Sequence, residues 1–327
     1  MKILVTGMGG FVGNNLAEYL IKNKFGQVYG TVYSKEGNME LVEELRKRIK
    51  SEVNVLGCDL TNFSEVFNLI HNVKPDIIFH LAGLTRVPYS FAAPKEFFKI
   101  NVNGTINVMD AVRAAGLETK IHVSGSSEEY GLIQPEELPV KETNTLRPLS
   151  PYAVSKIAQE MVAWQYHRSY GLNVYLSRCF NIIGPHSDDS MSFATFAKQI
   201  AEIEMGQRKE IMVGNLTAFR DYVDVHDVCR AYWLLVNKCK VGEVYNIATG
   251  TAHSMEAILN QLIKLSKKNG SIEVVRDKKK FRPSDVPLLQ GDSSKFIEAT
   301  GWKPEYSIEK TLEDVMNYWR EKVKRCK

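Results

Sequence analysis

The sequence predicts an α/β fold in which a doubly wound parallel sheet is joined to a smaller, mixed α/β C-terminal lobe. Short apolar runs rich in β-branched residues alternate with stretches of helix length through the first half of the chain. These runs are continuously apolar, which is expected of parallel strands that helices cover on both faces. After about Gly184 the elements become shorter and their connections more polar, which predicts the second lobe.

The elements follow from local patterns. A long helix begins at Pro151, because Ser150 can cap it and proline is favoured at the first helical position. In the second lobe, Val225–Asn237 is a helix that could return to the first unit, and Ile308–Val323 is a final amphipathic helix. The predicted strands are Ile3–Thr6, Val28–Tyr33, Val53–Leu56, Ile77–Leu81, Ile121–Ser124 and Asn173–Ser177, and the long helix is Pro151–Tyr170.

Composition excludes several classes of protein. With 327 residues, 44% of them hydrophobic, the chain can build about two domains and is neither disordered nor a small disulfide scaffold. The 42 Lys and Arg are interspersed with 38 Asp and Glu, so no basic field for nucleic acid is concentrated anywhere. Five scattered cysteines predict no metal site and a reducing compartment. Without a leader or an apolar run of ~20 residues, we expect a cytoplasmic protein with no membrane attachment.

A glycine-rich segment, Gly7-Met8-Gly9-Gly10-Phe11-Val12-Gly13, joins the first predicted strand to a predicted helix. Gly7 permits a tight turn, Gly10 lets the backbone approach a pyrophosphate, and Gly13 lets the helix pack closely on the strand. The unpaired N–H groups and the dipole of the helix N-terminus favour an anion there. This context predicts a bound dinucleotide rather than an ordinary glycine turn.

The end of the second predicted strand bears on which dinucleotide binds. A site that prefers NAD has Asp or Glu about 20 residues after the last glycine, on the ribose 2′-hydroxyl. Here Ser34 and Lys35 could accommodate a 2′-phosphate, so NADP is favoured somewhat over NAD, although a merely solvated Lys35 is the alternative. Asp59 could accept hydrogen bonds from adenine, or could cap the helix that begins near Asn62.

Tyr152 and Lys156 are four residues apart in the predicted helix, so both project from one face. Ser126 and Glu128 follow the strand that ends at Ser124, and doubly wound sheets build their sites at the carboxyl ends of strands. Lowering the pKa of a phenol by ~3 units costs about 4 kcal/mol, which an adjacent Lys156 and a cationic nicotinamide ring could supply. We predict that Tyr152 exchanges a proton with a hydroxyl or carbonyl group of a substrate.

Six motifs resemble those of the extended short-chain dehydrogenase/reductases that act on nucleotide sugars. They are Thr6-Gly7-x-x-Gly10-Phe11-x-Gly13, His80-Leu81-Ala82-Gly83, Asn101-Val102-Asn103-Gly104-Thr105, Tyr152-x-x-x-Lys156, Asn181-x-x-Gly184-Pro185 and Arg220-Asp221-Tyr222-Val223. Segments 125–131, 146–152, 213–216 and 282–287 are similar to the GDP-mannose branch of this family. The resemblance implies a Rossmann-type, NAD(P)-binding domain over 1–184, with returning segments near 215–250, and a lobe over 185–327 that mainly binds a nucleotide sugar.

The resemblance also implies roles for particular residues. The implied catalytic residues are Ser126, Tyr152 and Lys156, with Glu128. The implied cofactor-binding residues are Gly7, Gly10, Phe11, Val12, Gly13, Ser34, Lys35, Asp59, Leu60, Leu81, Ala82, Gly83, Asn101 and Ser124, together with Tyr152 and Lys156. The implied substrate-binding residues are Thr85, Arg86, Ser126, Asn181, Lys198, Arg220, Arg282 and Asp285. A GDP-linked substrate and a homodimer formed through the helices over 94–115 and 151–170 are implied as well.

Two reactions are compatible with this pattern. A reductase would use Ser126 to hold the C4 carbonyl of GDP-4-keto-6-deoxy-D-mannose, and Tyr152 to give it a proton as hydride reaches C4. A 4,6-dehydratase would instead act on GDP-mannose, with Glu128 as the base that removes the C5 proton. Serine at 126, where the dehydratase pattern usually has Thr, favours the reductase. A non-catalytic NADP-binding sensor is a third hypothesis, which the joint presence of Tyr152 and Lys156 disfavours.

Two departures from the family pattern concern the substrate. Arg86 stands where a small or imidazole side chain is usual, which leaves the sugar specificity open. Asp285 stands where Glu is common.

Overall fold

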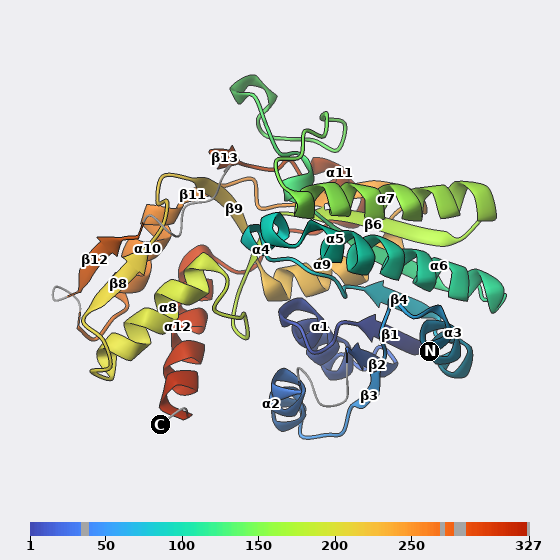
Figure 1. The fold of residues 1–327 in the computed structure, drawn as a ribbon, viewed down its shortest axis with the longest axis horizontal. Helices are drawn as coiled ribbons and strands as arrows, with labels where there is room; N and C mark the ends of the chain where they lie inside the picture. Colours follow the sequence, from blue (N-terminus) through green and yellow to red (C-terminus); the bar gives the residue numbers. More distant parts are fainter. Residues whose placement is uncertain (34–38, 269–271, 278–285, 326–327) are drawn as a thin grey trace.

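The computed structural model describes residues 1–33, 39–268, 272–277 and 286–325. Seven parallel strands form a central sheet, and a second lobe lies beyond one end of it (Figure 1). The strand order is β10-β6-β5-β4-β1-β2-β3. Their bounds are β1 Lys2–Thr6, β2 Gln27–Val32, β3 Asn54–Gly57, β4 Ile77–His80, β5 Lys120–Ser126, β6 Asn173–Cys179 and β10 Val244–Ile247.

The strand order reverses between β1 and β4. The chain runs outward from β1 through β2 to β3, and then returns to place β4 on the other side of β1. In an open α/β sheet this switch point, at the carboxyl ends of the strands, is where ligands bind. The fold therefore places the glycine-rich segment after β1 directly beside the segment that follows β4.

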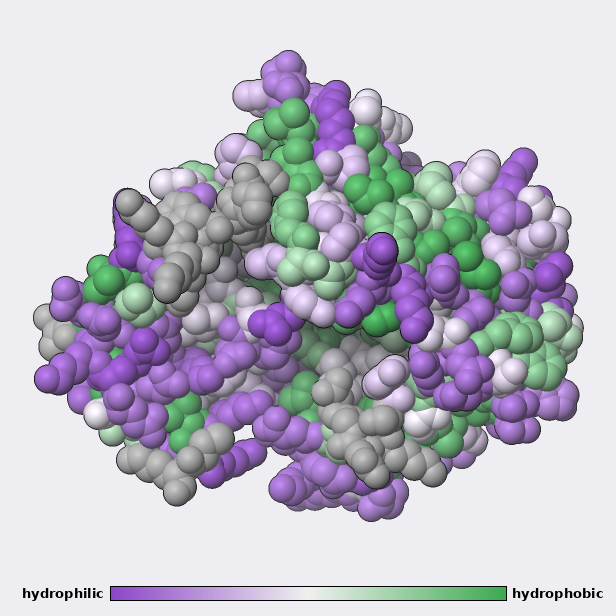
Figure 2. Space-filling model, viewed as in Figure 1, coloured by the Kyte–Doolittle hydropathy of each residue, from purple (hydrophilic) through white to green (hydrophobic). Residues whose placement is uncertain are grey.

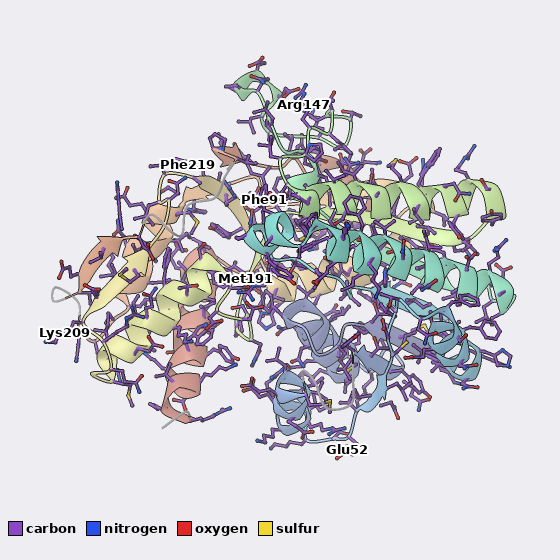
Figure 3. All side chains as sticks on the ribbon, viewed as in Figure 1. Glu52, Phe91, Arg147, Met191, Lys209 and Phe219 are labelled. Atoms are coloured by element: carbon purple, nitrogen blue, oxygen red, sulfur yellow. The ribbon has the colours of Figure 1, made fainter. Side chains whose placement is uncertain are left out.

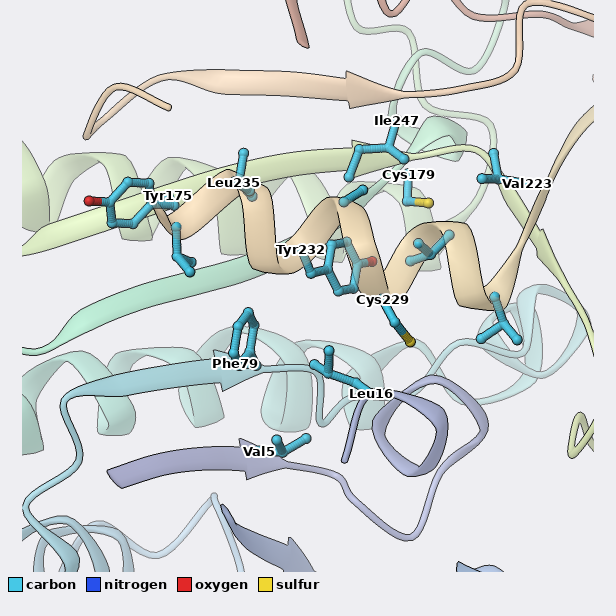
Figure 4. Close-up of a cluster of buried hydrophobic side chains, with 14 of the residues drawn as sticks. Val5, Leu16, Phe79, Tyr175, Cys179, Val223, Cys229, Tyr232, Leu235 and Ile247 are labelled. Atoms are coloured by element: carbon cyan, nitrogen blue, oxygen red, sulfur yellow. The ribbon is translucent and has the colours of Figure 1, made fainter. Parts of the chain in front are cut away.

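Helices cover both faces of the central sheet. Along β1, Ile3 and Val5 point into one apolar core and Leu4 into the other, as the alternation of a strand dictates. Figure 4 shows Tyr232 and Cys229 of α9 among side chains of the strands. The helices on the Ile3 face are α1 Phe11–Lys22, α2 Glu40–Ile49, α9 Val225–Lys238 and α11 Ser294–Thr300, and those on the Leu4 face are α3 Phe63–Val73, α6 Gly104–Ala114 and α7 Pro151–Tyr170.

The long helix that carries Tyr152 and Lys156 is confirmed as α7, with the predicted bounds. The Ser150 hydroxyl accepts a hydrogen bond from the N–H of Ala153 at 3.1 Å, which is the predicted cap. Gly171 ends the helix in the left-handed conformation.

The predicted helix over 94–115 is not continuous. It is divided into α5 Pro94–Phe97, a π-helical segment η1 Phe98–Asn103, and α6. The wider turn of a π-helix often occurs at functional sites. Here the π segment contains Asn101, whose side chain is fully buried.

The second lobe has its own apolar core, in which α8, α10 and α12 pack together. Two elements from this part of the sequence belong to the central sheet instead: β10 is its edge strand next to β6, and α9 packs on one of its faces. The elements of the lobe are α8 Ser192–Glu204, α10 Met255–Lys264, α12 Ile308–Arg325, the paired strands β8 Glu210–Val213 and β12 Glu273–Arg276, and β9 Phe219–Asp224 with its neighbours β7 Asn181–Ile183, β11 Ala252–Ser254 and β13 Leu288–Leu289.

Three shorter elements complete the fold. The chain between η2 Ser127–Glu129 and α7 projects from the body of the molecule, contains η3 Pro135–Glu137, and carries Arg147, as Figure 3 shows. Helix α4 Val87–Ala92 lies near the centre of the view in Figure 1, and the surface in Figure 2 is hollowed close by. Among the helices in the described ranges, none is both long and apolar enough to cross a membrane.

Candidate active site

The glycine loop forms a close-fitting turn against the switch point. Gly7 has φ +74°, and a Cβ there would lie 2.9 Å from the Cα of Ala82, which follows β4. A Cβ on Gly13 would lie 2.3 Å from the carbonyl oxygen of Gly7. Helix α1 has Gly10 as its N-cap, with no side-chain cap and no acidic residue in its first turn. Its N–H groups can therefore receive a pyrophosphate, and the residues present fit a dinucleotide.

Substitution of Gly13 by Ala is expected to weaken NADPH binding by about tenfold or more, ~1.4 kcal/mol, because α1 must move away from the Gly7 carbonyl. Fluorescence titration with NADPH measures the change. Gly104→Ala is the matched control, because a Cβ there would meet Leu60 Cβ at 3.4 Å and the Leu60 carbonyl oxygen at 3.9 Å, both ordinary contact distances. Equal affinity in the wild type and in Gly13→Ala would show that close packing of α1 is not required.

The loop after β4 is fixed by hydrogen bonds from a buried side chain, that of Asn101. Asn101 accepts a hydrogen bond from the Leu84 N–H at 2.8 Å and donates to the Leu84 carbonyl at 3.0 Å. Its amide also donates to the Ser155 hydroxyl at 3.0 Å. These contacts use both ends of a fully buried side chain, so Asn101 fixes the loop that contains Leu81, Ala82 and Gly83. That Asn101 also lines the cofactor path stays a prediction.

The structure brings the predicted catalytic residues Ser126, Tyr152 and Lys156 to one place. Ser126 ends β5, and its hydroxyl lies close enough to the Tyr152 phenol to lower the pKa of that phenol. The same hydroxyl accepts a hydrogen bond from the Glu128 N–H at 3.2 Å, so Ser126 also caps η2. Tyr152 and Lys156 are 7% and 6% exposed, which places both at the edge of the core.

The predicted lowering of the Tyr152 pKa is not found in the protein alone. Burial raises the pKa of the phenol, and the nearby charges of Glu128 and Glu129 raise it further, while the Ser126 hydroxyl opposes them. Lys156 is not among the groups that shift it. A phenol in this setting stays protonated at neutral pH, which suits a proton donor better than a base.

Lys156 is held by two acceptors within the protein. Its ammonium donates to the Ser124 carbonyl at 2.7 Å and to the Gln159 side-chain carbonyl at 2.8 Å. Burial lowers the pKa of Lys156 to about 8, and the carboxylate of Glu129 opposes this. The hydroxyl of Ser124 lies 3.0 Å from that of Tyr232, and its contact with the cofactor stays a prediction.

Behind Ser126 lies a buried cluster of charges that the sequence did not reveal. Glu129 is fully buried and accepts a hydrogen bond from the Ser126 N–H at 2.7 Å. Arg178 forms a bidentate pair with Glu160, at 2.9 and 2.6 Å, and lies 3.4 Å from Glu129. Burial, and then the charge of Glu160, raise the pKa of Glu129 well above its usual range. Glu128, by contrast, is only partly buried and lies close enough to Tyr152 to act on its pKa.

The predicted substrate residues differ in how the structure places them. Thr85 and Arg86 are exposed before α4, whereas Arg220 is buried and donates to the Val286 carbonyl at 2.6 Å. Lys198 is paired with Asp189 at 2.6 Å. Asn181, at the start of β7, has a buried side-chain oxygen with no hydrogen-bond partner among the described residues, as expected of a group that meets a ligand.

For some of the predicted site residues, the predicted role is not tested by the structure. The Asp59 side chain accepts hydrogen bonds from Thr61, and Asn62 rather than Asp59 caps α3. Leu60 is a core residue. Ser34, Lys35, Arg282 and Asp285 lie outside the described residues.

The fold and the arrangement of Ser126, Tyr152 and Lys156 define the class of protein, an extended short-chain dehydrogenase/reductase. Over residues 4–315 the chain matches the family described as GDP-mannose 4,6 dehydratase, and it belongs to that family. The resemblance and the Rossmann-type fold predicted from the motifs are thereby confirmed.

Relatives in this family include both reductases and dehydratases. The chain is 31% identical to the GDP-6-deoxy-D-mannose reductase of Pseudomonas aeruginosa, covering 99% of this chain and 98% of the relative. It is 30% identical to the GDP-mannose 4,6 dehydratase 2 of Arabidopsis thaliana, covering 99% and 88%.

Solved structures resemble it over the whole length. The structure of RMD from Pseudomonas aeruginosa complexed with NADPH has a TM-score of 0.82 at 30% identity, covering 98% of this chain and 99% of that one. The UDP-glucose 4-epimerase of Thermotoga maritima with UDP-glucose has a TM-score of 0.86 at 27% identity, covering 99% and 100%.

Proposed function

We propose that this protein is a nucleotide-sugar reductase, which converts the C4 keto group of GDP-4-keto-6-deoxy-D-mannose to a hydroxyl, giving GDP-D-rhamnose or its C4 epimer. The observation that carries the proposal is the buried Tyr152 phenol beside the Ser126 hydroxyl, with a raised pKa that keeps its proton available. The full-length similarity to a GDP-6-deoxy-D-mannose reductase supports this choice of substrate.

In this reaction the Ser126 hydroxyl would hold the C4 carbonyl oxygen, and Tyr152 would give that oxygen its proton. The bound nicotinamide would supply the hydride for C4. Lys156 has three N–H donors, of which two are used by Ser124 and Gln159. The third has no acceptor in the described part of the chain and would be available to the ribose of the cofactor.

We propose NADP as the preferred cofactor, with NAD as the alternative. Support comes from the uncapped N-terminus of α1 behind the glycine loop, and from the NADPH complex of the related P. aeruginosa structure. The preference for NADP depends on Ser34 and Lys35 in the sequence. Comparing the dissociation constants of NADPH and NADH by fluorescence titration tests it, and tighter binding of NADH would contradict it.

The substrate would lie between the carboxyl ends of the strands and the second lobe. We propose that Arg220 contacts the diphosphate, because a guanidinium binds phosphate oxygens in a planar fork. We propose that Asn181, in β7, also contacts the substrate, where its unsatisfied buried side-chain oxygen would accept a hydrogen bond from a hydroxyl group. Arg282 and Asp285 would contact the nucleotide, with Lys198 beside the base and Thr85 and Arg86 beside the sugar. In this division, residues 1–184 and the returning segments near 215–250 bind the dinucleotide, and the remainder of 185–327 mainly binds the sugar nucleotide.

The test follows turnover of two substrates. Oxidation of NADPH with GDP-4-keto-6-deoxy-D-mannose, measured by absorbance and by the mass of the reduced sugar, is the expected result. Loss of water from GDP-mannose without net consumption of cofactor would instead identify a 4,6-dehydratase. Turnover of the UDP-linked but not the GDP-linked keto sugar would contradict the assigned base.

The dehydratase alternative rests on Glu128, which is partly exposed and near Tyr152. If the protein is a reductase, Glu128→Gln is expected to change keto-sugar reduction by less than tenfold, because reduction needs no base at C5. If it is a dehydratase, the same change removes the base and lowers turnover of GDP-mannose by ~10²–10⁴-fold. Steady-state kinetics of both substrates on this one variant separates the two reactions.

We also propose a homodimer formed through the helices over 94–115 and 151–170. Large apolar side chains are exposed at spacings that share one face of α7: Val154 at 40%, Met161 at 45% and Trp164 at 46%. Trp164→Glu is expected to give a monomer by light scattering. Phe63→Glu, at an equally exposed position on α3, is the control. An unchanged mass for Trp164→Glu would contradict this interface.

A cytoplasmic location is proposed as well. Cys58, Cys179, Cys229 and Cys239, the cysteines within the described ranges, are free thiols, and three of them are buried. Such thiols persist most readily in a reducing compartment.

A further inference from the structure

A chain of buried hydrogen bonds leads from Lys156 on α7, through α6 and β4, to the end of β1. The Gln159 side-chain carbonyl accepts from the Lys156 ammonium at 2.8 Å, and its amide donates to the Thr105 hydroxyl at 2.9 Å. That hydroxyl lies 3.0 Å from His80 Nε2, and His80 Nδ1 lies 2.9 Å from the Thr6 hydroxyl. None of these five side chains is more than 6% exposed.

The far end of the chain is the switch point itself. The Thr6 oxygen accepts hydrogen bonds from the backbone N–H groups of Leu81, at 3.1 Å, and Ala82, at 3.2 Å. Thr6 is the last residue of β1, immediately before Gly7 of the glycine loop. The hydrogen bonds thus connect the ammonium on α7 to the turn that would hold the pyrophosphate.

The direction of each hydrogen bond is fixed by counting donors. The single hydroxyl hydrogen of Thr105 is used on the Asn101 carbonyl, at 2.6 Å, so His80 must donate from Nε2. His80 Nδ1 is then an acceptor, and the Thr6 hydroxyl donates to it. Burial lowers the pKa of His80 to about 3, which keeps the ring in this neutral form. With every position occupied in one direction, the chain cannot pass a proton along and acts as a rigid connection.

We propose that Gln159 is a positioning residue, which together with Thr105 and His80 fixes the Lys156 ammonium at a set place relative to the cofactor loop. This inference rests on the proposed function, because the position of Lys156 matters only if Lys156 contacts a bound cofactor. A lysine side chain carries about 2 kcal/mol of rotamer entropy, and a buried acceptor on a rigid connection removes that freedom before the cofactor arrives.

The charge of Lys156 gives the proposal a distinctive readout. The ionisable groups that act on Lys156 or that it acts on come from three further elements: Glu129 of η2, His80 of β4 and His122 of β5. Removing the Gln159 carbonyl takes away an acceptor of the charged form, so the pKa of Lys156 must fall. Placing a carboxylate there must raise it.

The experiment compares Gln159→Met and Gln159→Glu with the wild type across pH. The alkaline limb of kcat/KM for NADPH is expected to move to lower pH by about one unit in Gln159→Met, and to higher pH in Gln159→Glu. Gln159→Met is also expected to bind NADPH about tenfold more weakly, as ~1.4 kcal/mol of prior ordering is lost.

Gln199→Met is the matched control. Gln199 is a buried glutamine in the second lobe whose amide makes two hydrogen bonds, with the Met212 N–H at 2.8 Å and the Met212 carbonyl at 3.2 Å. A purely structural role for Gln159 predicts that both Met variants lose thermal stability and keep the wild-type pH profile. That outcome, or shifts of the same sign in the Met and Glu variants, would overturn the proposal.

Failure of the proposed function is separable from failure of this inference. If no sugar nucleotide is turned over, the reductase assignment fails, yet the pH dependence of NADPH binding still measures the two opposite shifts. If Gln159→Met does not fold, Gln159→Glu tests the proposal alone. An alkaline limb of the pH profile that is the same in Gln159→Glu as in the wild type contradicts the proposal.

Discussion

Tyr152→Phe is expected to lower kcat/KM for the keto sugar by ~10²–10⁴-fold and to leave the affinity for NADPH nearly unchanged. The substitution removes only the phenolic oxygen, which is the proton donor in the proposed reaction. The ring itself remains packed edge-on against Phe97. Steady-state kinetics gives the loss of rate, and fluorescence titration gives the cofactor affinity.

Tyr166→Phe provides the control on the same helix. Tyr166 is similarly buried, and its hydroxyl interacts with Asp110, far from Ser126. This control is expected to retain its rate. A Tyr152→Phe variant that also retained it would show that another group delivers the proton, and a loss of cofactor binding would show that the phenol acts in binding rather than in chemistry.

Arg178→Met is expected to destabilise the protein by about 3–5 kcal/mol, because it removes a cation that contacts both buried carboxylates, Glu129 and Glu160. Glu160 loses a bidentate partner, and Glu129 loses the guanidinium that opposes its desolvation. Urea unfolding at neutral pH measures the change in the free energy of unfolding.

The loss in the free energy of unfolding caused by Arg178→Met should depend on pH. Without Arg178, the guanidinium that opposes the rise is lost, so the pKa of Glu129 in the folded state lies still further above its value in the unfolded chain. A raised carboxyl pKa destabilises the folded state above that pKa, and the penalty is relieved as pH falls through it. Arg178→Met should therefore lie closer to the wild type at mildly acidic pH than at neutral pH.

Arg147→Met is the matched comparison for the buried pair. Arg147 also forms a bidentate pair with a glutamate, Glu137, at 2.7 and 2.9 Å, but on the projecting chain before α7. Ion pairs that water reaches contribute little, and the Arg147 and Glu137 side chains are 37% and 22% exposed, so the unfolding midpoint of Arg147→Met should change much less than that of Arg178→Met. Equal losses in the two variants would contradict the role assigned to burial.

The central sheet was predictable because most of its strands are short apolar segments, which can be recognised from the local sequence. Six of its seven strands are continuous apolar runs that end within a few residues of the predicted positions, and the glycine loop lies where the sequence placed it. The seventh strand, β10, was missed because its four residues include Asn246, a buried polar residue whose hydrogen bonds to Val140 and Asp292 only the fold creates. The π-helical turn around Asn101 likewise has no signature in the spacing of apolar residues.

The candidate site divides in the same way. Tyr152 and Lys156 share a helix face, so their proximity was a matter of sequence spacing. Glu129 was not predicted as a site residue beside Glu128, because which of two adjacent carboxylates turns inward depends on Arg178, which lies on the neighbouring strand β6 but far along the sequence. The proximity of Gln159 to Lys156 could be seen in the sequence, because the two residues are three positions apart on a helix. The role of Gln159 depends on its hydrogen bond to Thr105, which is more than fifty positions away in the sequence. Contacts of this kind arise from topology and cannot be deduced from spacing.

The return of α9 and β10 to the central sheet also shapes how the chain is made. While the ribosome is still adding the second lobe, the nascent chain presents β6 as an open strand edge, and the apolar face that α9 will cover lies bare. Such surfaces invite aggregation until they are closed. The first domain can therefore complete its fold only after Ile247 has emerged, and a fragment that stops at Gly184 should recover its structure only when the remainder of the chain is supplied in trans.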